Sequence, residues 1–289
     1  MPDLTHHRIP AAGVSLHVVT AGPPDGSPLV LLHGWPDSWR CWERVIPLLA
    51  GEYRLIVPDQ RGFGQSDMPE GTAAYAMPMP AADVLALLDR FEVERAGLVG
   101  HDFGGAVVWS LGAFAPGRFT RAVVMAAPHP MRLREVAAGD RRQLERSFYV
   151  WLMHAGPAGE SLLASGGFRP LADWAFGGSR VPAEVIEEHV ASWQEPGRFH
   201  AMAEWYRANF RPELFDPEVP LGLPPVAIPV RYLHGERDPA FVESAATGSG
   251  AFVAAEYDEA VVPGTTHWIP SDAPEEVAAA VRDWMQRGI

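Results

Sequence analysis

Asp102 lies in the segment GHDFGG (residues 100–105), between the apolar run AGLVG and a stretch with helical spacing of its apolar residues. The small residues around it allow a strand and a helix to approach closely at a tight, strained turn. A turn of this kind exposes the side chain at its apex, where many hydrolases carry a nucleophilic serine. An aspartate after a strand can also be a plain helix N-cap, but the glycine pattern favours a nucleophile.

A carboxylate nucleophile restricts the class of substrate. A serine that attacked a saturated carbon would end as an ether, which water does not cleave, whereas a carboxylate forms an ester whose carbonyl carbon remains open to attack. The carboxylate is ionised near neutral pH without a base, so a histidine is free to activate water for a second step. Asp102 therefore predicts covalent catalysis at an electrophilic sp3 carbon.

Two later segments supply the partners of such a nucleophile. Asp238 ends the segment VRYLHGERD, and His267 lies in VVPGTTHWIP after the next strand-like run. Nucleophile, acid and histidine follow in the chain order expected for this architecture, and both partners lie in loops at strand carboxyl ends. Alone, each would be an ordinary turn or loop residue. Together they predict that His267 deprotonates water while Asp238 orients the imidazole and stabilises its cation.

Hydrolysis of the ester also needs hydrogen-bond donors for an oxyanion. The backbone N–H of Phe103 follows the nucleophile, and that of Trp35 lies in HGWP after an earlier buried strand. Both have the expected topological places. We therefore expect these two N–H groups to form the oxyanion hole and both side chains to line the pocket, while His33 braces its loop.

The elements that must position these residues alternate between apolar runs and helices. From Arg54 onward the order is RLIV, a helix near Pro80 to Phe91, AGLVG, a helix from Phe103 to Phe114, and AVVMAA. This order predicts a parallel sheet covered by helices on both faces. Upstream, a hairpin that turns at Ala12-Gly13 predicts an antiparallel beginning of the sheet.

Strand-like runs are missing from about Pro128 to Pro225, where segments with helical spacing are separated by Gly and Pro. This pattern indicates a helical insertion. We therefore expect a core made of residues 1–128 and 224–289, with residues 129–223 as a helical lid.

The alternating pattern resumes with VRYLHG, a helix, EYDEAVV and a closing amphipathic helix from Pro274 to Arg287. Ser271 and Asp272 are the N-cap candidates for that helix.

The composition is that of an ordinary folded protein of 289 residues with a net charge of −13 at pH 7. This negative charge argues against nucleic acid or a membrane surface as a partner. Cys41 is the single cysteine, which excludes an intrachain disulfide and fits a reducing compartment. With neither a secretory pattern at the N-terminus nor an apolar run of spanning length, we expect a cytoplasmic protein.

No cofactor is expected from the motifs. The Cys and His residues lack zinc-ligand spacing, and the segment DQRGFGQS lacks the Gly-Lys pair of a phosphate-binding loop. We therefore expect no metal and no nucleotide cofactor.

The sequence resembles the α/β-hydrolase superfamily, and within it the branch of epoxide hydrolases and haloalkane dehalogenases. HGWPDS, DQRGFGQSD, GHDFGG, the helical insertion, HGERD and GTTHW occur in the order of that family. The resemblance covers essentially the whole chain. It implies the α/β-hydrolase fold, a mostly parallel central sheet flanked by helices with an inserted helical lid.

The leaving group distinguishes the two kinds of enzyme. Opening an epoxide produces an alkoxide, which needs a proton or a strong hydrogen bond, whereas a halide needs only soft N–H donors. Epoxide hydrolases of this family use two lid tyrosines for that purpose, and Tyr149 in SFYVWLMHAG and Tyr206 in EWYRANF match their places. The resemblance therefore implies an epoxide hydrolase that produces a vicinal diol, with both tyrosines protonating the ring oxygen.

The main alternative is a haloalkane or haloacid dehalogenase that uses the same Asp102 ester. Haloalkane dehalogenases commonly have Asn after His-Gly and Trp after the nucleophile, where this chain has Trp35 and Phe103. Fluoroacetate dehalogenases share WYRANF but carry an Arg after the nucleophile, so a carboxylate substrate is disfavoured unless Arg132 or Arg134 reaches the pocket. A non-catalytic ligand receptor on the same scaffold is a third alternative, against which the complete triad argues.

The chain also departs from the commoner epoxide hydrolase pattern, which has Trp after the nucleophile and Tyr-Phe-Gln in the first lid helix, where residues 152–154 are Leu-Met-His. We expect an apolar, aromatic pocket suited to a lipophilic or aryl epoxide. A homodimer is one assembly that the sequence leaves open. The residues expected to line the pocket are Trp35, Phe103, Trp151, Met153 and Trp268.

Overall fold

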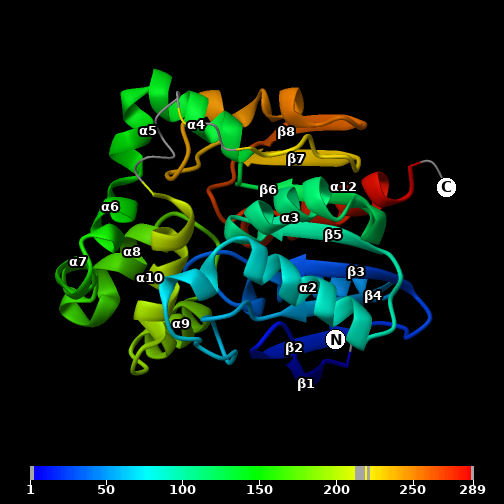
Figure 1. Cartoon of the computed structure of the whole chain (residues 1–289), viewed down its shortest axis with the longest axis horizontal. Helices are drawn as coiled ribbons and strands as arrows, with labels where there is room; N and C mark the ends of the chain where they lie inside the picture. The colour runs from blue at the N-terminus through cyan, green and yellow to red at the C-terminus, as the bar shows by residue number, and fades with distance from the viewer. Residues whose placement is uncertain (1–2, 212–218, 220–221, 288–289) are drawn as a thin grey trace.

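The computed structural model describes residues 3–211, 219 and 222–287. Its strands form one sheet of eight in the order β1-β2-β4-β3-β5-β6-β7-β8 (Figure 1). The strands are β1 Thr5–Pro10, β2 Ser15–Ala21, β3 Ser27–Leu32, β4 Tyr53–Pro58, β5 Ala96–His101, β6 Phe119–Met125, β7 Val230–Gly235 and β8 Tyr257–Val262.

The sheet begins antiparallel and continues parallel. β1 pairs with β2, and β2 with β4, in antiparallel register, while every pairing from β4 to β8 is parallel. The β1–β2 hairpin turns where Gly13 adopts a φ of 80°, a conformation that glycine reaches without strain. The mixed sheet predicted from the sequence is confirmed.

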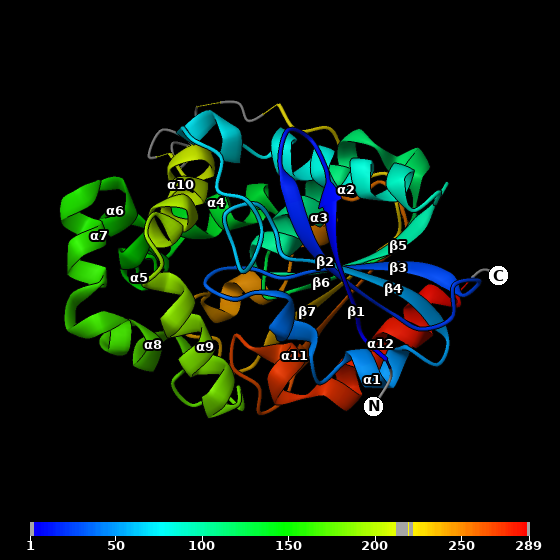
Figure 2. The ribbon, with the colours of Figure 1, turned by 90° about the horizontal axis from the view of Figure 1, so that it is seen from below.

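Helices cover both faces of the sheet (Figure 2). α2 (Pro78–Arg90) and α3 (Phe103–Phe114) lie on one face, and α1 (Ile46–Leu49) and α12 (Pro274–Met285) on the other. Successive strand residues point to opposite faces, so along β3 the side chains alternate between two separate hydrophobic clusters. Both faces are therefore buried, and the central strands consist of continuous apolar residues.

Seven α-helices follow β6 and precede β7 in the described chain. We call them the lid, and α6 to α9 lie together at one end of the sheet in both views (Figures 1 and 2). Residues 212–218 and 220–221 of the expected lid lie outside the described residues, and the division at residues 128 and 223 stays a prediction. The lid helices are α4 Pro130–Gly139, α5 Arg141–Arg146, α6 Phe148–His154, α7 Pro157–Leu163, α8 Arg169–Phe176, α9 Ala183–Trp193 and α10 Arg198–Asn209.

The prediction of a helix between β7 and β8 is wrong. The chain there forms two short 3-10 turns, Glu243–Ala246 and Ser249–Phe252. Gly248 separates them with a φ of 93°, which no helical residue adopts, and Gly250 adds a second poor helix former. The segment is therefore too broken to continue as an α-helix.

The prediction that Ser271 or Asp272 is the N-cap of the last helix is also wrong. Ala273 occupies the N-cap of α12 and makes no side-chain cap. Asp272 ends the preceding short helix α11 (Ile269–Asp272), and its carboxylate accepts hydrogen bonds from the backbone N–H and the hydroxyl of Thr266, each at 2.6 Å. Its side chain thus braces the residue before His267 instead of the helix.

Candidate active site

The strand order brings the predicted nucleophile and an oxyanion donor together. β3 has β4 on one side and β5 on the other, and β3 leads along the chain to β4. In such sheets the loops diverge at this point and leave a crevice at the carboxyl ends of the strands. Leu32 pairs with Gly100, so the residues that follow the two strands, Gly34 and Asp102, lie beside each other.

Asp102 sits at a strained turn between β5 and α3. Its φ of 51° and ψ of −121° lie outside the regions that side chains other than glycine favour. The turn is also crowded, because a Cβ on Gly34 would lie 2.3 Å from the Cβ of Asp102, and one on Gly104 would lie 2.1 Å from the carbonyl oxygen of Leu32. The small residues predicted to permit this turn are therefore required by direct contacts.

Both carboxylate oxygens of Asp102 face polar partners. Oδ1 accepts a hydrogen bond from the backbone N–H of Trp35 at 2.7 Å, and Oδ2 lies 3.5 Å from Nε2 of His267. Burial alone would raise the pKa of Asp102, but the hydrogen bond and charge of His267 and the Trp35 N–H outweigh it and lower that pKa. The carboxylate is therefore ionised at neutral pH, as a nucleophile must be.

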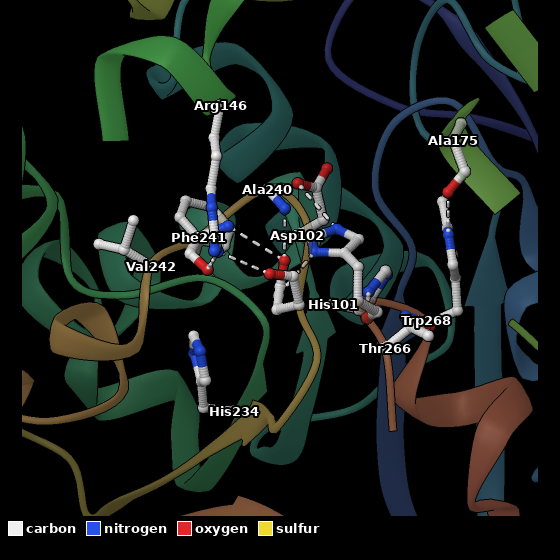
Figure 3. A network of polar contacts seen from close by, with 12 residues as sticks. His101, Asp102, Arg146, Ala175, His234, Ala240, Phe241, Val242, Thr266 and Trp268 are labelled. Atoms are coloured by element: carbon white, nitrogen blue, oxygen red, sulfur yellow. Dashed lines mark hydrogen bonds and ion pairs between the residues drawn. The ribbon is translucent and has the colours of Figure 1, made fainter. Parts of the chain in front are cut away.

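Asp238 holds the imidazole of His267 from the other side. Its Oδ2 lies 2.9 Å from Nδ1 of His267, and its Oδ1 accepts from the backbone N–H groups of Ala240 and Phe241 at 2.7 and 3.0 Å. Arg146 reaches this segment from the lid (Figure 3) and donates to the carbonyl oxygen of Asp238 at 2.8 Å. Every oxygen of the acid is thus fixed, and Nε2 of His267 is left to face Asp102.

The two carboxylates control the protonation of His267. Burial alone would lower the pKa of the imidazole, but the charge of Asp238 and the hydrogen bonds to Asp102 and Asp238 outweigh it and raise that pKa to about 10. At neutral pH the resting histidine is therefore a cation between two anions. It becomes a base only when one of these anions loses its charge.

The predicted oxyanion donors lie on either side of Asp102. The Trp35 N–H already contacts its carboxylate. Phe103 begins α3, and N–H groups in the first turn of a helix have no intrahelical acceptor. The Trp35 N–H is therefore placed where it can stabilise charge on an oxygen of Asp102, and the same role for the Phe103 N–H stays a prediction.

His101 is a site residue that the sequence analysis did not select. Its Nε2–H donates to the carbonyl oxygen of His267 at 2.8 Å, and the two rings meet at an angle of 61° with centroids 4.8 Å apart. Burial and the nearby charge of His267 lower its pKa to about 4, so it stays neutral beside the cation. Its position directly before Asp102 in GHDFGG is the sequence feature that could have identified it as a site residue.

Two lid helices bring the predicted tyrosines over the nucleophile. Tyr149 of α6 and Tyr206 of α10 lie edge to face, with ring centroids 5.6 Å apart, and share a hydrogen bond. Tyr149 also stacks on Trp35 at 5.4 Å with an angle of 7° between the rings. The two residues are 57 positions apart in sequence, and only the folding of the lid brings them together.

One pocket is lined by Asp102, His267, Tyr149, Tyr206 and Trp35, whereas Asp238 and Phe103 are not among its lining residues. Apart from the charged pair Asp102 and His267, the lining is aromatic or apolar. The lining residues are Trp35, Pro36, Asp102, Tyr149, Trp174, Ala175, Tyr206, Pro239, Ala240, His267 and Trp268.

Phe103, Trp151 and Met153 are not among these lining residues, unlike Trp35 and Trp268. The ring of Phe103 contacts Tyr206 at a centroid distance of 4.8 Å and is buried beneath the pocket. Trp151 is two positions after Tyr149 on α6 and so points to the opposite side of the helix. Met153 is fully buried, one turn beyond Tyr149. The rotation of α6 therefore excludes Trp151 from the lining, whereas Met153 lies on the same face as Tyr149 but is buried one turn away from the pocket.

Among the described residues, no group of three or more His, Cys, Asp or Glu side chains could hold a metal ion. The helices in that part of the chain include none with the length and apolar character needed to cross a bilayer.

Comparison with known proteins places this site in a family. The family model of the alpha/beta hydrolase fold matches residues 27–151. The AB hydrolase superfamily protein YfhM of Bacillus subtilis is 37% identical over 201 residues, which cover 68% of this chain and 70% of that protein. Epoxide hydrolase 3 of Xenopus tropicalis is 30% identical over 288 residues, or 96% of this chain and 77% of that protein. The chain therefore belongs to the α/β-hydrolase superfamily.

The similarity to epoxide hydrolases extends over nearly the full length. A solved structure of an epoxide hydrolase from metagenomes of hot environments superposes with a TM-score of 0.84 at 28% identity and covers 99% of both chains. The resemblance inferred from the sequence motifs is confirmed at this level: the protein is an epoxide hydrolase-like α/β hydrolase.

Proposed function

We propose that the protein hydrolyses epoxides to vicinal diols through an ester on Asp102. The observation that carries the proposal is the presence of Tyr149 and Tyr206 in the same pocket as Asp102 and His267. A departing alkoxide needs an acid, and these two hydroxyls are placed to serve as one. A haloalkane substrate would need no such pair.

In the first step a carboxylate oxygen of Asp102 attacks the less hindered ring carbon, and the carbon–oxygen bond of the ring breaks. The ring oxygen takes a proton from the hydroxyl pair of Tyr149 and Tyr206. Burial and nearby groups, among them the charge of Asp102, raise the pKa of both tyrosines, which keeps them protonated before the reaction. As the ester forms, negative charge leaves Asp102 and appears on the ring oxygen, where the hydroxyls stabilise it.

Formation of the ester also prepares the base for the second step. Asp102 raises the pKa of His267 through a hydrogen bond and through its charge, and both effects fall away when the carboxylate becomes an ester. The pKa of His267 then drops toward neutrality, where a general base is most effective. The proton that His267 then releases passes through solvent to the tyrosine pair, which gave up a proton in the first step, and the resting cation becomes a base.

In the second step water adds to the carbonyl carbon of the ester while His267 takes its proton. The N–H groups of Trp35 and Phe103 stabilise the oxyanion. The bond between the carbonyl carbon and the alkyl oxygen then breaks, and the departing oxygen receives a proton from His267. The carboxylic acid left on Asp102 gives its proton to His267, which restores the resting ion pair, so that one epoxide and one water yield one diol.

The test uses a His267→Gln variant, which should form the ester but not hydrolyse it. We expect the intact mass of the protein to increase by the full mass of styrene oxide, and peptide analysis to locate this mass on a peptide that contains Asp102. A bromoalkane should add no mass. The double variant Asp102→Asn, His267→Gln is the matched control and should gain no mass. Alkylation by the bromoalkane alone would indicate a dehalogenase, and no adduct from either compound would contradict the proposed nucleophile or substrate class.

A further inference from the structure

The indole nitrogen of Trp35 is a buried donor without a partner. The side chain is 4% exposed, and its Nε1 has no hydrogen-bond acceptor in the described part of the protein. The indole nitrogens of Trp42 and Trp284 share this property among the described residues, but of these three tryptophans only Trp35 lines the pocket. A buried donor that stays unpaired loses its hydrogen bond to water without compensation.

The other polar groups of the lining already have partners. The indole N–H of Trp268 donates to the carbonyl oxygen of Ala175 at 2.6 Å (Figure 3). The hydroxyls of Tyr149 and Tyr206 bond to each other. Trp174 is partly exposed at the edge of the pocket, so its N–H can reach water. The proline and alanine side chains that complete the lining carry no polar atom.

Packing prevents the Trp35 indole from turning elsewhere to find an acceptor. One face of its ring lies against Tyr149, and Tyr206 meets it at an angle of 85° with centroids 5.4 Å apart. The backbone of the same residue is tied to Asp102. Because Trp35 lines the pocket, a molecule bound there is the available source of an acceptor for this N–H.

The charge of the site restricts what that acceptor can be. Asp102 is ionised in the resting pocket, which disfavours an anionic group a few ångströms away. The remaining class is a neutral oxygen, such as an ether or a carbonyl oxygen. Because the same residue contacts Asp102 through its backbone, this oxygen has to lie close to the reacting carbon.

We infer that the indole N–H of Trp35 selects epoxides that carry a neutral oxygen acceptor next to the epoxide ring. Aryl glycidyl ethers are simple compounds of this class. The inference rests on the proposed function and adds a substrate class to it. It assigns a specificity role to the side chain of Trp35, separate from the role proposed for its backbone.

The experiment compares two substrates of nearly equal shape, phenyl glycidyl ether and 1,2-epoxy-4-phenylbutane, in which a methylene replaces the ether oxygen. A Trp35→Phe variant keeps an aromatic ring but lacks the N–H. We expect it to lower the ratio of kcat/KM for the ether over that for the carbon analogue by about 3- to 10-fold, the range of a neutral hydrogen bond. The two epoxides differ in intrinsic reactivity, but this difference is the same for both proteins and cancels when the kcat/KM ratio of the variant is compared with that of the wild type.

Trp42→Phe is the matched control. Trp42 is fully buried and its Nε1 also has no partner, but it does not line the pocket. The ratio should stay at the wild-type value in this variant. An unchanged ratio in Trp35→Phe, or an equal loss for both substrates, would overturn the inference and leave the proposed function intact.

A second measurement does not depend on the folding of the variant. In wild-type protein with 15N-labelled tryptophan, the diol of the ether should shift the Trp35 indole N–H resonance downfield more than the diol of the carbon analogue. Equal shifts would contradict the inference. Failure of both epoxides to form an ester on the His267→Gln protein would instead contradict the proposed function, and the inference with it.

Discussion

Trp193 of lid helix α9 donates its indole N–H to the carbonyl oxygen of Pro36 at 3.0 Å. One turn earlier on the same helix, Nε2 of His189 lies 2.9 Å from Oδ1 of Asp37. Both core residues follow Trp35, whose backbone N–H contacts Asp102. The lid therefore does more than cover the pocket, because it fixes the loop that carries a proposed oxyanion donor.

A Trp193→Phe variant should slow hydrolysis of the Asp102 ester by about tenfold, the cost of one lost hydrogen bond transmitted to the donor loop. Rapid-quench mass spectrometry would detect this as accumulation of the alkylated protein during turnover. Trp109→Phe is a suitable control, because Trp109 also donates to a backbone carbonyl, that of Ala127 at 2.8 Å, but does not contact this loop. Equal effects of the two variants would indicate a general loss of stability.

The pKa of His267 should depend on the charge of Asp102. In the resting protein it is raised to about 10, and an Asp102→Asn variant mimics the loss of charge in the ester. We expect the pKa of His267 to be lower in this variant, since removing an adjacent anion disfavours the imidazolium. NMR titration of the ring, assigned by comparison with His267→Gln, measures the shift directly. An unchanged pKa would mean that ester formation does not switch the base.

The same raised pKa has a consequence for stability. A histidine whose pKa is higher in the folded than in the unfolded protein stabilises the fold fully below its unfolded value near 6.5 and loses that contribution as the pH rises through about 10. The free energy of unfolding of the wild type, relative to His267→Gln, should therefore decrease between pH 7 and pH 10.5. Urea denaturation at several pH values would test this, and a difference that grows with pH would contradict it.

Each of the two lid tyrosines should contribute to ring opening and not to hydrolysis of the ester. Replacing Tyr149 or Tyr206 by Phe should lower the rate of alkylation by an epoxide by about 10- to 100-fold, and the double variant should lose more. Single-turnover kinetics on the His267→Gln background isolates this step. Alkylation of the single variants by the epoxide at the rate of the parent would contradict a role of the tyrosines in ring opening.

Gly34 should tolerate no side chain. A Cβ at this position would lie 2.3 Å from both Cβ and Oδ1 of Asp102, so Gly34→Ala should displace the carboxylate and reduce turnover by at least about 100-fold. Gly51→Ala is the control, because nothing lies within 4 Å of a Cβ there. Turnover of the purified variants, with circular dichroism to verify folding, tests the prediction. An active Gly34→Ala protein would show that the turn can relax.

Features that depend on neighbouring residues could be predicted from the sequence. The bounds of α3 agree with the expected Phe103 to Phe114, because one glycine-rich turn determines where β5 ends and the helix begins. Asp102, Asp238 and His267 were recognisable because each follows a strand-like run, and the carboxyl ends of such strands meet at one edge of a parallel sheet.

Contacts between distant segments were decided only by the tertiary structure. The indole of Trp268 is held by Ala175, 93 residues away in the chain, and Asp272 gives its carboxylate to Thr266 instead of capping α12. Trp174 lines the pocket while Trp151 does not, because the rotation of short lid helices depends on packing against the core rather than on their own periodicity. The sequence by itself thus determined the sheet and indicated the proposed nucleophile and its partners, whereas the shape of the pocket and the partners of its polar groups arose from the fold.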